Sequence, residues 1–311
     1  MIFQENVSLK KYSNFQIGGP ARYFCEPQTE AELLGALAQA QKMNESIFIL
    51  GGGCNLLIND AGFAGVVIKP SLKKIEERGD GLVCVGAGVL VSDFLEFCLE
   101  RELSGWEWAG GLPGTVGGAI WGDAGAFGGE TKDKVVQVAS IQVVDGEKIV
   151  RTGKECEFGY RTSIFKTKAK DEIIIEAVFQ LQKGSKVTMH QAIEQRKQSR
   201  REKHPLEHPN IGSIFKNIPV EKVPPEVLKQ YESKIKLDPF PVLPTAILSS
   251  AAGLKGYQVG GARVSEKHPN FIVNVGGATS ADVLVVMRHI QATVREKFGV
   301  ELEQEVIFVG F

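Results

Sequence analysis

The chain has 311 residues, which is enough for two or three domains with separate hydrophobic cores. Its hydrophobic fraction of 43% and charged fraction of 23% are those of an ordinary globular protein. A net charge of −1 at pH 7 gives no electrostatic reason to expect a nucleic acid or an anionic membrane as partner, so we expect small molecules.

The N-terminal sequence predicts a cytoplasmic protein. The first residues, MIFQENVSLKK, contain no apolar core of signal-peptide length, and no apolar run approaches the roughly 18 residues that cross a bilayer. An odd number of cysteines without C-x-x-C spacing favours reduced thiols and gives no metal site. These cysteines are Cys25, Cys54, Cys84, Cys98 and Cys156.

The first predicted elements form a β-α-β unit. Residues 21–26 are typical of a short strand, and Thr29 with Glu32 forms a capping box that starts a helix through about Met43. A buried-type strand at 47–50 then runs into GGGCNLL. This order of elements predicts a mixed α/β fold.

Two common nucleotide-binding motifs are excluded by spacing. A dinucleotide fingerprint starting at Gly86-Ala87-Gly88 has Val91 where its third glycine belongs. No G-x-x-x-x-G-K-[ST] sequence occurs. Any phosphate group must therefore be held by another glycine architecture.

Residues 110–129, GGLPGTVGGAIWGDAGAFGG, contain nine glycines and one charged residue, Asp123. Inside a regular element, glycine lowers stability by about 0.5 to 1 kcal/mol per position relative to alanine. So many glycines in one stretch therefore require an explanation. We expect consecutive N–H groups at 114–119 to cradle phosphates or the edge of a flavin. The alternative is a set of structural turns. A second glycine cluster at 51–53, also behind a predicted strand, favours one extended cofactor.

Further elements follow in order. The sequence predicts a helix from Asp93, with Glu96 as capping partner, to Arg101, and it predicts a loop at 158–166. The predicted strands are 66–69, 82–86, 135–144, 148–151 (a hairpin with the preceding strand around Asp145-Gly146) and 172–181.

A basic helical segment at 188–203 carries Arg196, Lys197, Arg200, Arg201 and Lys203. It is either a solvated helix face or a phosphate-attracting rim beside an active site. Residues 204–210 are typical of a linker. The C-terminal block then predicts helices at 245–252 and 280–297, the latter capped by Thr279 or Ser280, and strands at 270–275 and 300–309.

Several motifs, taken in order, resemble one family, the UDP-N-acetylenolpyruvoylglucosamine reductases, in its shorter type without an inserted tyrosine-bearing loop. They are IGGPA (17–21), GGGCNLL (51–57), GLPGTVGGA (111–119), DAGAFG (123–128), GYRTSIFK (159–166), GSIFKN (212–217), GGARVSEKHPNFIVN (260–274) and LEQEV (302–306).

The resemblance implies a vanillyl-alcohol-oxidase-like FAD-binding fold, of the α/β (α+β) class, with two subdomains and a C-terminal α/β substrate domain. We expect subdomains at 1–69 and 70–205 and a substrate domain at 206–311, whose last strand, 300–311, returns to the active site. It also implies a cytoplasmic reductase of peptidoglycan synthesis, which we expect to be a monomer, with non-covalent FAD and NADPH as reductant.

The resemblance also assigns residues. The positions expected to bind cofactor are Gly51, Gly52, Gly53, Cys54, Asn55, Leu56, Gly111, Pro113, Gly114, Thr115, Gly117, Gly118, Ala119, Asp123, Gly125 and Ala126. The positions expected to bind substrate are Tyr160, Lys216, Asn217, Arg263 and His268. Arg161, Ser213 and Glu305 correspond to the catalytic set.

The implied chemistry suits those three residue types. Hydride addition to an enol ether conjugated to a carboxylate builds an enediolate, which Arg161 can bind through two donors and Glu305 can stabilise if it carries a proton. Ser213 can supply the final proton. Taken alone, each has an ordinary structural interpretation: a surface ion pair, a turn serine and a solvated glutamate.

Three positions depart from the family pattern. Cys54 stands where serine is usual, Asp123 where asparagine is usual, and Ile218 separates Asn217 from Pro219. An unpaired carboxylate at Asp123 would add negative charge near the cofactor. Two other functions stay open: a different FAD oxidoreductase of the same superfamily, such as an oxidase, and a non-catalytic flavin or nucleotide carrier.

Overall fold

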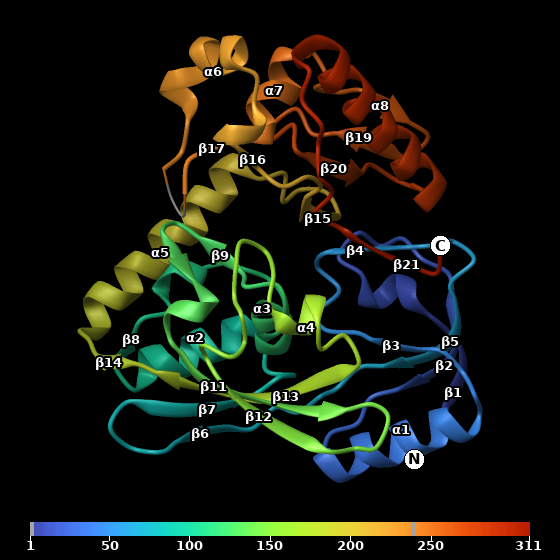
Figure 1. The fold of residues 1–311 in the computed structure, drawn as a ribbon, viewed down its shortest axis with the longest axis vertical. Coiled ribbons are helices and arrows are strands. Elements are labelled where there is room, and N and C mark those ends of the chain that lie inside the picture. Colours follow the sequence, from blue (N-terminus) through green and yellow to red (C-terminus); the bar gives the residue numbers. More distant parts are fainter. Residues whose placement is uncertain (1–2, 238–239) are drawn as a thin grey trace. The chain divides into compact units, whose positions relative to one another are not determined.

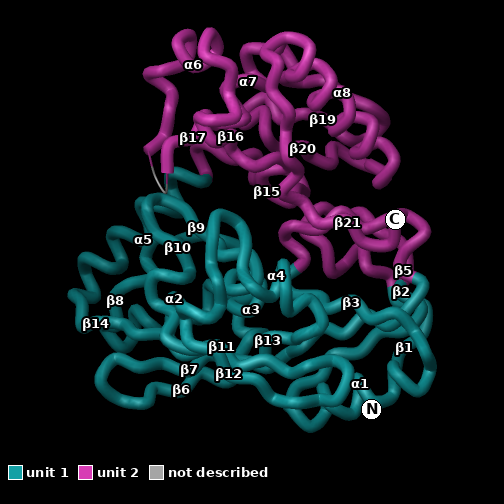
Figure 2. Tube along the Cα trace, in the orientation of Figure 1, with its two compact units in different colours: residues 1–7, 21–52, 64–200 teal, residues 8–20, 53–63, 201–311 magenta. Residues whose placement is uncertain are grey.

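The computed structural model describes residues 3–237 and 240–311, and the chain divides into two compact units (Figure 2). Unit 1 comprises residues 1–7, 21–52 and 64–200; unit 2 comprises residues 8–20, 53–63 and 201–311. The division into three domains stays a prediction. Two short N-terminal segments belong to the same unit as the C-terminal block, a feature that the sequence did not indicate.

The first sheet of unit 1 has the strand order β1-β2-β5-β3. Its elements are β1 (Gln4–Ser8), β2 (Pro20–Cys25), β3 (Ile47–Ile49) and β5 (Phe63–Ile68), with α1 (Glu30–Lys42) between β2 and β3. The predicted capping box is confirmed in its first half, because Thr29 accepts a hydrogen bond from the Glu32 amide at 3.1 Å. The Glu32 carboxylate instead accepts from the Gln28 amide at 2.7 Å. The apolar face of α1 packs against the buried residues of β5, and both belong to a small hydrophobic core.

The second sheet of unit 1 is antiparallel, in the order β12-β11-β13-β7-β6. Its strands are β6 (Ile75–Glu77), β7 (Leu82–Gly86), β11 (Val135–Gln142), β12 (Lys148–Thr152) and β13 (Glu172–Gln180). The predicted hairpin is confirmed by the β11–β12 pairing. The central strand β13 is buried on both faces over most of its length, so this sheet is the framework of the unit.

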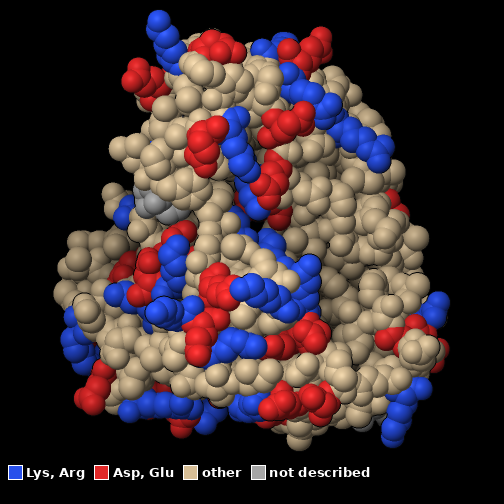
Figure 3. Space-filling model, in the orientation of Figure 1, with Lys and Arg blue, Asp and Glu red and all other residues tan. Residues whose placement is uncertain are grey.

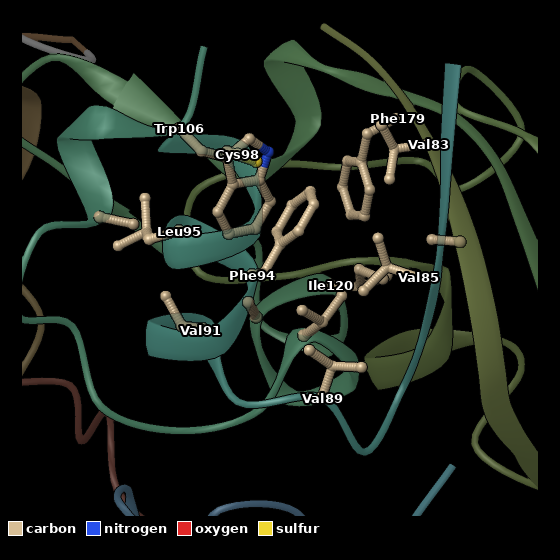
Figure 4. Packing of buried hydrophobic residues seen from close by; sticks show 14 of the residues in the cluster. Val83, Val85, Val89, Val91, Phe94, Leu95, Cys98, Trp106, Ile120 and Phe179 are labelled. Carbon is tan, nitrogen blue, oxygen red and sulfur yellow. The ribbon is translucent and has the colours of Figure 1, made fainter. Parts of the chain in front are cut away.

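The main core of unit 1 lies between this sheet and the helices α2 (Val91–Glu100) and α3 (Val116–Trp121). Figure 4 shows Phe94, Trp106 and Phe179 meeting at its centre, with ring centroids 5.0 to 5.3 Å apart. The predicted start of α2 at Asp93 was wrong. The helix begins at Val91 without a side-chain cap, because Val91 and Phe94 are both buried in this core.

Unit 2 is built on the sheet β15-β20-β19-β18, against which α8 packs (Figure 1). These strands are β15 (Asn210–Ser213), β18 (Gln258–Val259), β19 (Ala262–Val264) and β20 (Phe271–Asn274). The helices are α6 (Pro225–Tyr231), α7 (Thr245–Ala251) and α8 (Ser280–Phe298). Of the two predicted caps of α8, Thr279 is the N-cap, and it forms a capping box with Asp282. Phe15, Ile17 and Leu57 from the N-terminal segments lie in the same core.

The chain's last strand, β21 (Ile307–Val309), pairs in parallel with β4 (Leu56–Ile58). The prediction of a strand over 300–309 was therefore wrong for its first part. The predicted loop at 158–166 was wrong at its end, where α4 (Ile164–Thr167) forms. Besides short 3-10 turns, the other strands and the remaining α-helix are β8 (Leu103–Ser104), β9 (Gly125–Ala126), β10 (Gly129–Glu130), β14 (Gln182–Lys183), α5 (Lys186–Lys203), β16 (Ile218–Pro219) and β17 (Val242–Leu243).

Charges of both signs are interspersed on the face shown in Figure 3. Within residues 3–237 and 240–311, no helix is long and apolar enough to cross a membrane. In the same residues, His, Cys, Asp and Glu side chains form no group of three or more that could hold a metal ion.

Candidate functional site

The glycine loop after β3 presents unused backbone donors. Within the described part of the chain, the amides of Gly51, Gly52 and Gly53 donate no hydrogen bond. A Cβ at Gly52 would lie 2.5 Å from Gly114 Cα, and one at Gly53, whose φ is +65°, would lie 1.8 Å from the Tyr12 carbonyl oxygen. Packing thus requires glycine at positions 52 and 53. Because the three amides have no acceptor in the described part of the chain, they can bind an anion.

The second glycine loop differs from our expectation of consecutive unused N–H groups. The Val116 amide donates to the Val89 carbonyl at 2.8 Å, and the Gly117 amide donates to the Ala87 carbonyl at 2.9 Å. The Gly118 amide donates to Thr115 Oγ1 at 3.3 Å, which caps α3. The Ala119 amide likewise donates to the Thr115 carbonyl at 2.9 Å. The expectation was therefore wrong for these four amides, because the fold itself uses them.

The glycines of this loop also have different reasons to lack a side chain. A Cβ at Gly117 would lie 2.8 Å from the Ala87 Cβ, so the protein's own packing excludes it. At Gly118 and Gly122 a Cβ would meet no atom closer than 3.4 Å and 3.7 Å respectively. Packing does not explain these two glycines, which makes them the positions where a flat ligand can lie against bare backbone. The predicted residue Ala119 is buried in α3, and Gly111 and Pro113 lie in the turn before it.

Asp123 is fully buried directly after α3. Its Oδ1 accepts a hydrogen bond from the Lys132 amide at 3.0 Å, and its Oδ2 lies 3.4 Å from Lys132 Nζ. Burial raises the pKa of this carboxyl, which the contacts with Lys132 counteract. The added charge at this position is therefore paired. Lys132 was missed in the sequence because it carries no motif.

Arg161 lies in a tight turn in which the amides and carbonyls of Gly159 and Thr162 pair with each other at 3.0 Å. Its φ of +58° is in the left-handed region, which costs a non-glycine residue about 1 to 2 kcal/mol. The guanidinium donates from Nη2 to the Gly125 carbonyl at 2.9 Å and from Nη1 to the Asp123 carbonyl at 3.4 Å. These bonds join the predicted catalytic arginine to the predicted cofactor residues Asp123 and Gly125.

Lys166 closes the same turn, since its Nζ donates to the Arg161 carbonyl at 2.9 Å. The Tyr160 ring lies 5.2 Å from the Arg161 guanidinium carbon. Strain of this kind is kept only where the surroundings hold it, and it is frequent at functional sites.

Ser213 and Glu305 come together within unit 2. The Glu305 amide donates to the carbonyl of Ile214, the residue after Ser213, at 2.8 Å. The Asn55 side chain donates to the Glu305 carbonyl at 3.1 Å, and the Ile307 amide donates to the Asn55 carbonyl at 3.0 Å. The loop of Cys54, Asn55 and Leu56 therefore fixes the extended segment that carries Glu305, directly before β21. The Ser213 hydroxyl makes no hydrogen bond with a residue that the structure describes.

The weaker candidates in unit 2 differ in whether their polar atoms have partners in the described structure. Lys216 pairs with Glu303, and Asn217 accepts a hydrogen bond from the Thr245 amide at the start of α7 at 3.3 Å. Arg263, on β19, has a buried Nε without a hydrogen bond in the described residues. His268 packs against His204 and Phe271, and its Nδ1 is buried and unbonded in the described residues. Burial lowers its pKa to about 4.

The basic helix α5 is not simply a solvated face. Arg200 is 9% exposed, donates from Nε to the Gly110 carbonyl at 2.9 Å, and has its pKa lowered to about 10 by burial. Lys197 pairs with Glu194 at 2.8 Å. Arg200 thus packs against the start of the glycine-rich stretch. The charge pattern alone could not show whether this arginine is buried or solvated.

Comparison with known proteins gives consistent matches along the chain. The C-terminal domain family of UDP-N-acetylenolpyruvoylglucosamine reductase matches residues 204–309, and a family described as an FAD binding domain matches residues 21–153.

Curated relatives extend over nearly the whole chain. UDP-N-acetylenolpyruvoylglucosamine reductase from Lactobacillus delbrueckii subsp. bulgaricus is 40% identical over 99% of this chain and 95% of its own. The protein of the same name from Caldanaerobacter subterraneus subsp. tengcongensis is 38% identical over 98% and 93%. A crystal structure of UDP-N-acetylenolpyruvylglucosamine reductase from Thermus caldophilus superposes with a TM-score of 0.78 at 29% identity, covering 99% of this chain and 100% of that one.

Proposed function

Because the chain belongs to the UDP-N-acetylenolpyruvoylglucosamine reductases, we propose that Arg161, Ser213 and Glu305 carry out its reaction. That reaction is the FAD-dependent, NADPH-consuming reduction of UDP-N-acetylglucosamine enolpyruvate to UDP-N-acetylmuramate in peptidoglycan synthesis. The family relationship supports the activity, and the arrangement of these residues supports their roles.

The glycine loops fit FAD. The unused amides of Gly51, Gly52 and Gly53 are suited to a pyrophosphate, and the bare backbone at Gly118 and Gly122 suits the face of a flat ring. Bound FAD supplies hydride transfer from NADPH to the enol ether. The polypeptide has to hold the cofactor, orient the substrate carboxylate and provide a proton.

Arg161 orients the carboxylate in this proposal. Its bonds to the carbonyls of Asp123 and Gly125 fix the plane of the guanidinium, so the fork is pre-organised for the charge that develops on the substrate. Negative charge is most strongly stabilised by donors that need no reorganisation during the reaction.

Ser213 gives the proton and Glu305 stabilises the same intermediate. The single observation that carries this assignment is the 2.8 Å hydrogen bond from the Glu305 amide to the Ile214 carbonyl, which places both residues on adjoining backbone. A hydroxyl without a hydrogen-bond partner among the described residues is available to a substrate. Tyr160, Lys216, Asn217, Arg263 and His268 are proposed to contact the rest of the substrate.

Cytoplasmic location and a monomeric state are proposals as well. They rest on the family to which the chain belongs and on the small-molecule substrates of its reaction. Fractionation and sedimentation would test them.

The activity is tested by anaerobic mixing. Purified protein should carry one non-covalent FAD, NADPH should bleach it, and UDP-N-acetylglucosamine enolpyruvate should restore the colour in one turnover. An oxidase would instead be reoxidised by oxygen with release of peroxide, and a carrier would not be bleached. Either of those results would overturn the proposal.

A further inference from the structure

The two-residue turn between β9 and β10 carries an unusual residue. Ala126 pairs with Gly129, and the two residues between them, Phe127 and Gly128, have φ values of +53° and +82°. Two positive values define the type I′ hairpin turn, whose first position favours asparagine, aspartate or glycine. Phenylalanine there is strained, and the residue is 41% exposed.

Two arginines from α5 lie over that ring. The guanidinium carbons of Arg196 and Arg200 are 5.0 and 5.2 Å from the Phe127 centroid, within cation–π range. Arg200 is anchored by its bond to the Gly110 carbonyl. Within the described residues, Arg196 Nε and Arg200 Nη2 are buried and unbonded. Ion pairing therefore does not explain why these nitrogens are buried here, whereas contact with the ring does.

The hairpin that has Phe127 in its turn begins at Gly125, the residue to which Arg161 is hydrogen-bonded. Gly125, the first residue of β9, pairs with Glu130 and accepts the 2.9 Å hydrogen bond from Arg161 Nη2. On the opposite strand, β10, a Cβ at Gly129 would lie 2.5 Å from the Trp108 side chain. Strand β10 therefore packs directly against the core. The position of the Gly125 carbonyl thus depends on a short, strained hairpin that is held at its tip from α5.

We propose that Phe127, clamped by Arg196 and Arg200, is a positioning residue that orients Arg161 through the Gly125 carbonyl. The proposal rests on the catalytic role proposed for Arg161. It gives the basic helix a function other than a solvated face or a phosphate-binding rim.

The test uses the FAD-bound enzyme and follows the two half-reactions separately. Phe127→Ala should slow reoxidation of the reduced flavin by UDP-N-acetylglucosamine enolpyruvate about tenfold and leave reduction by NADPH within about twofold. Phe127→Tyr should restore the rate. Arg200→Met, changed outside the hairpin, should act in the same direction. Amide hydrogen exchange across residues 125–130 should accelerate at least tenfold in both slowed variants.

A matched control and a double-mutant cycle separate positioning from general damage. Arg101→Met removes an arginine that stacks on Phe97 at 4.0 Å elsewhere in unit 1, and it should change neither half-reaction. In an Arg161→Ala background, Phe127→Ala should add no further slowing.

Normal reoxidation in Arg161→Ala alone would overturn the proposed function of that residue, and with it this inference. If Arg161→Ala is slow, three results would overturn the inference and leave the proposed function standing. They are full-rate reoxidation in Phe127→Ala, a tenfold effect that persists without Arg161, and loss of FAD from Phe127→Ala.

Discussion

Asn55 donates a hydrogen bond from its side chain to the main-chain carbonyl of Glu305, 250 residues away in the sequence, at 3.1 Å. Asn55 belongs to a glycine loop predicted to bind cofactor, and Glu305 is a predicted catalytic residue. Both lie in unit 2, where the segments that follow them in the chain pair with each other as the strands β4 and β21. The bond indicates that this asparagine positions the segment that carries Glu305.

Asn55→Ala should therefore affect chemistry more than cofactor retention. Loss of one partly buried hydrogen bond should lower the free energy of unfolding by about 1 kcal/mol. Reoxidation of reduced flavin by the enolpyruvyl substrate should slow, while reduction by NADPH stays close to wild type. Asn274→Ala is the control, because Asn274 makes a similar bond to the Phe15 carbonyl at 3.1 Å, and it should lose stability without that selectivity. Loss of FAD with normal reoxidation would return Asn55 to a cofactor role.

The glycines of the second loop can be tested individually. Gly118→Ala should stabilise the FAD-free protein by up to about 1 kcal/mol, since alanine is favoured in a helix and the Cβ has room. FAD affinity should fall at least tenfold if bare backbone faces the cofactor. Gly35→Ala in α1, where a Cβ meets no atom within 4 Å, is the matched control for helix propensity. Wild-type FAD affinity in Gly118→Ala, measured by titration of the flavin-free protein, would remove Gly118 from the cofactor site.

Gly117 illustrates what the sequence can and cannot predict. The sequence shows two glycine clusters and places them after strands. It cannot show that a Cβ at Gly117 would meet Ala87 at 2.8 Å, whereas one at Gly118 would meet only Thr115 Oγ1, at 3.4 Å. A Gly117→Val variant would disturb α3 itself, so loss of FAD from it would say little about the cofactor.

Several local signals were accurate, although the cap predicted at Asp93 was not. Thr29 and Thr279 cap the helices predicted from them, and the turn at Asp145-Gly146 joins β11 to β12. Contacts over long separations were not visible, such as the pairing of Ile307 with Leu56 or the burial of Arg200 beside Gly110. Such contacts depend on how the elements pack, which motif spacing does not encode.

His268 should make the protein sensitive to acid. Burial lowers its pKa to about 4 from an ordinary value of 6.5, so the native state holds the neutral ring. Its contribution to stability is complete above pH 6.5 and is lost as the pH falls toward 4, by about 3 kcal/mol at most. Replacing the histidine by glutamine should flatten the pH dependence of the unfolding free energy between pH 4 and 6.5. Urea unfolding at several pH values measures this, and parallel curves for the two proteins would contradict it.

Ser213→Ala separates the two halves of the catalytic cycle. If its hydroxyl gives the final proton, it is not needed while NADPH reduces the flavin, and bleaching should proceed at nearly the normal rate. Reoxidation by the enolpyruvyl substrate should slow about a hundredfold or more, the usual scale for a positioned acid. The change should cost little stability, because the hydroxyl has no hydrogen-bond partner in the described structure. Ser249→Ala, which also removes an unbonded hydroxyl from unit 2, should leave both steps unchanged. Stopped-flow mixing with each reagent in turn measures the two steps separately. Equal slowing of both steps would indicate damaged FAD binding. Normal reoxidation would exclude Ser213 as the proton donor.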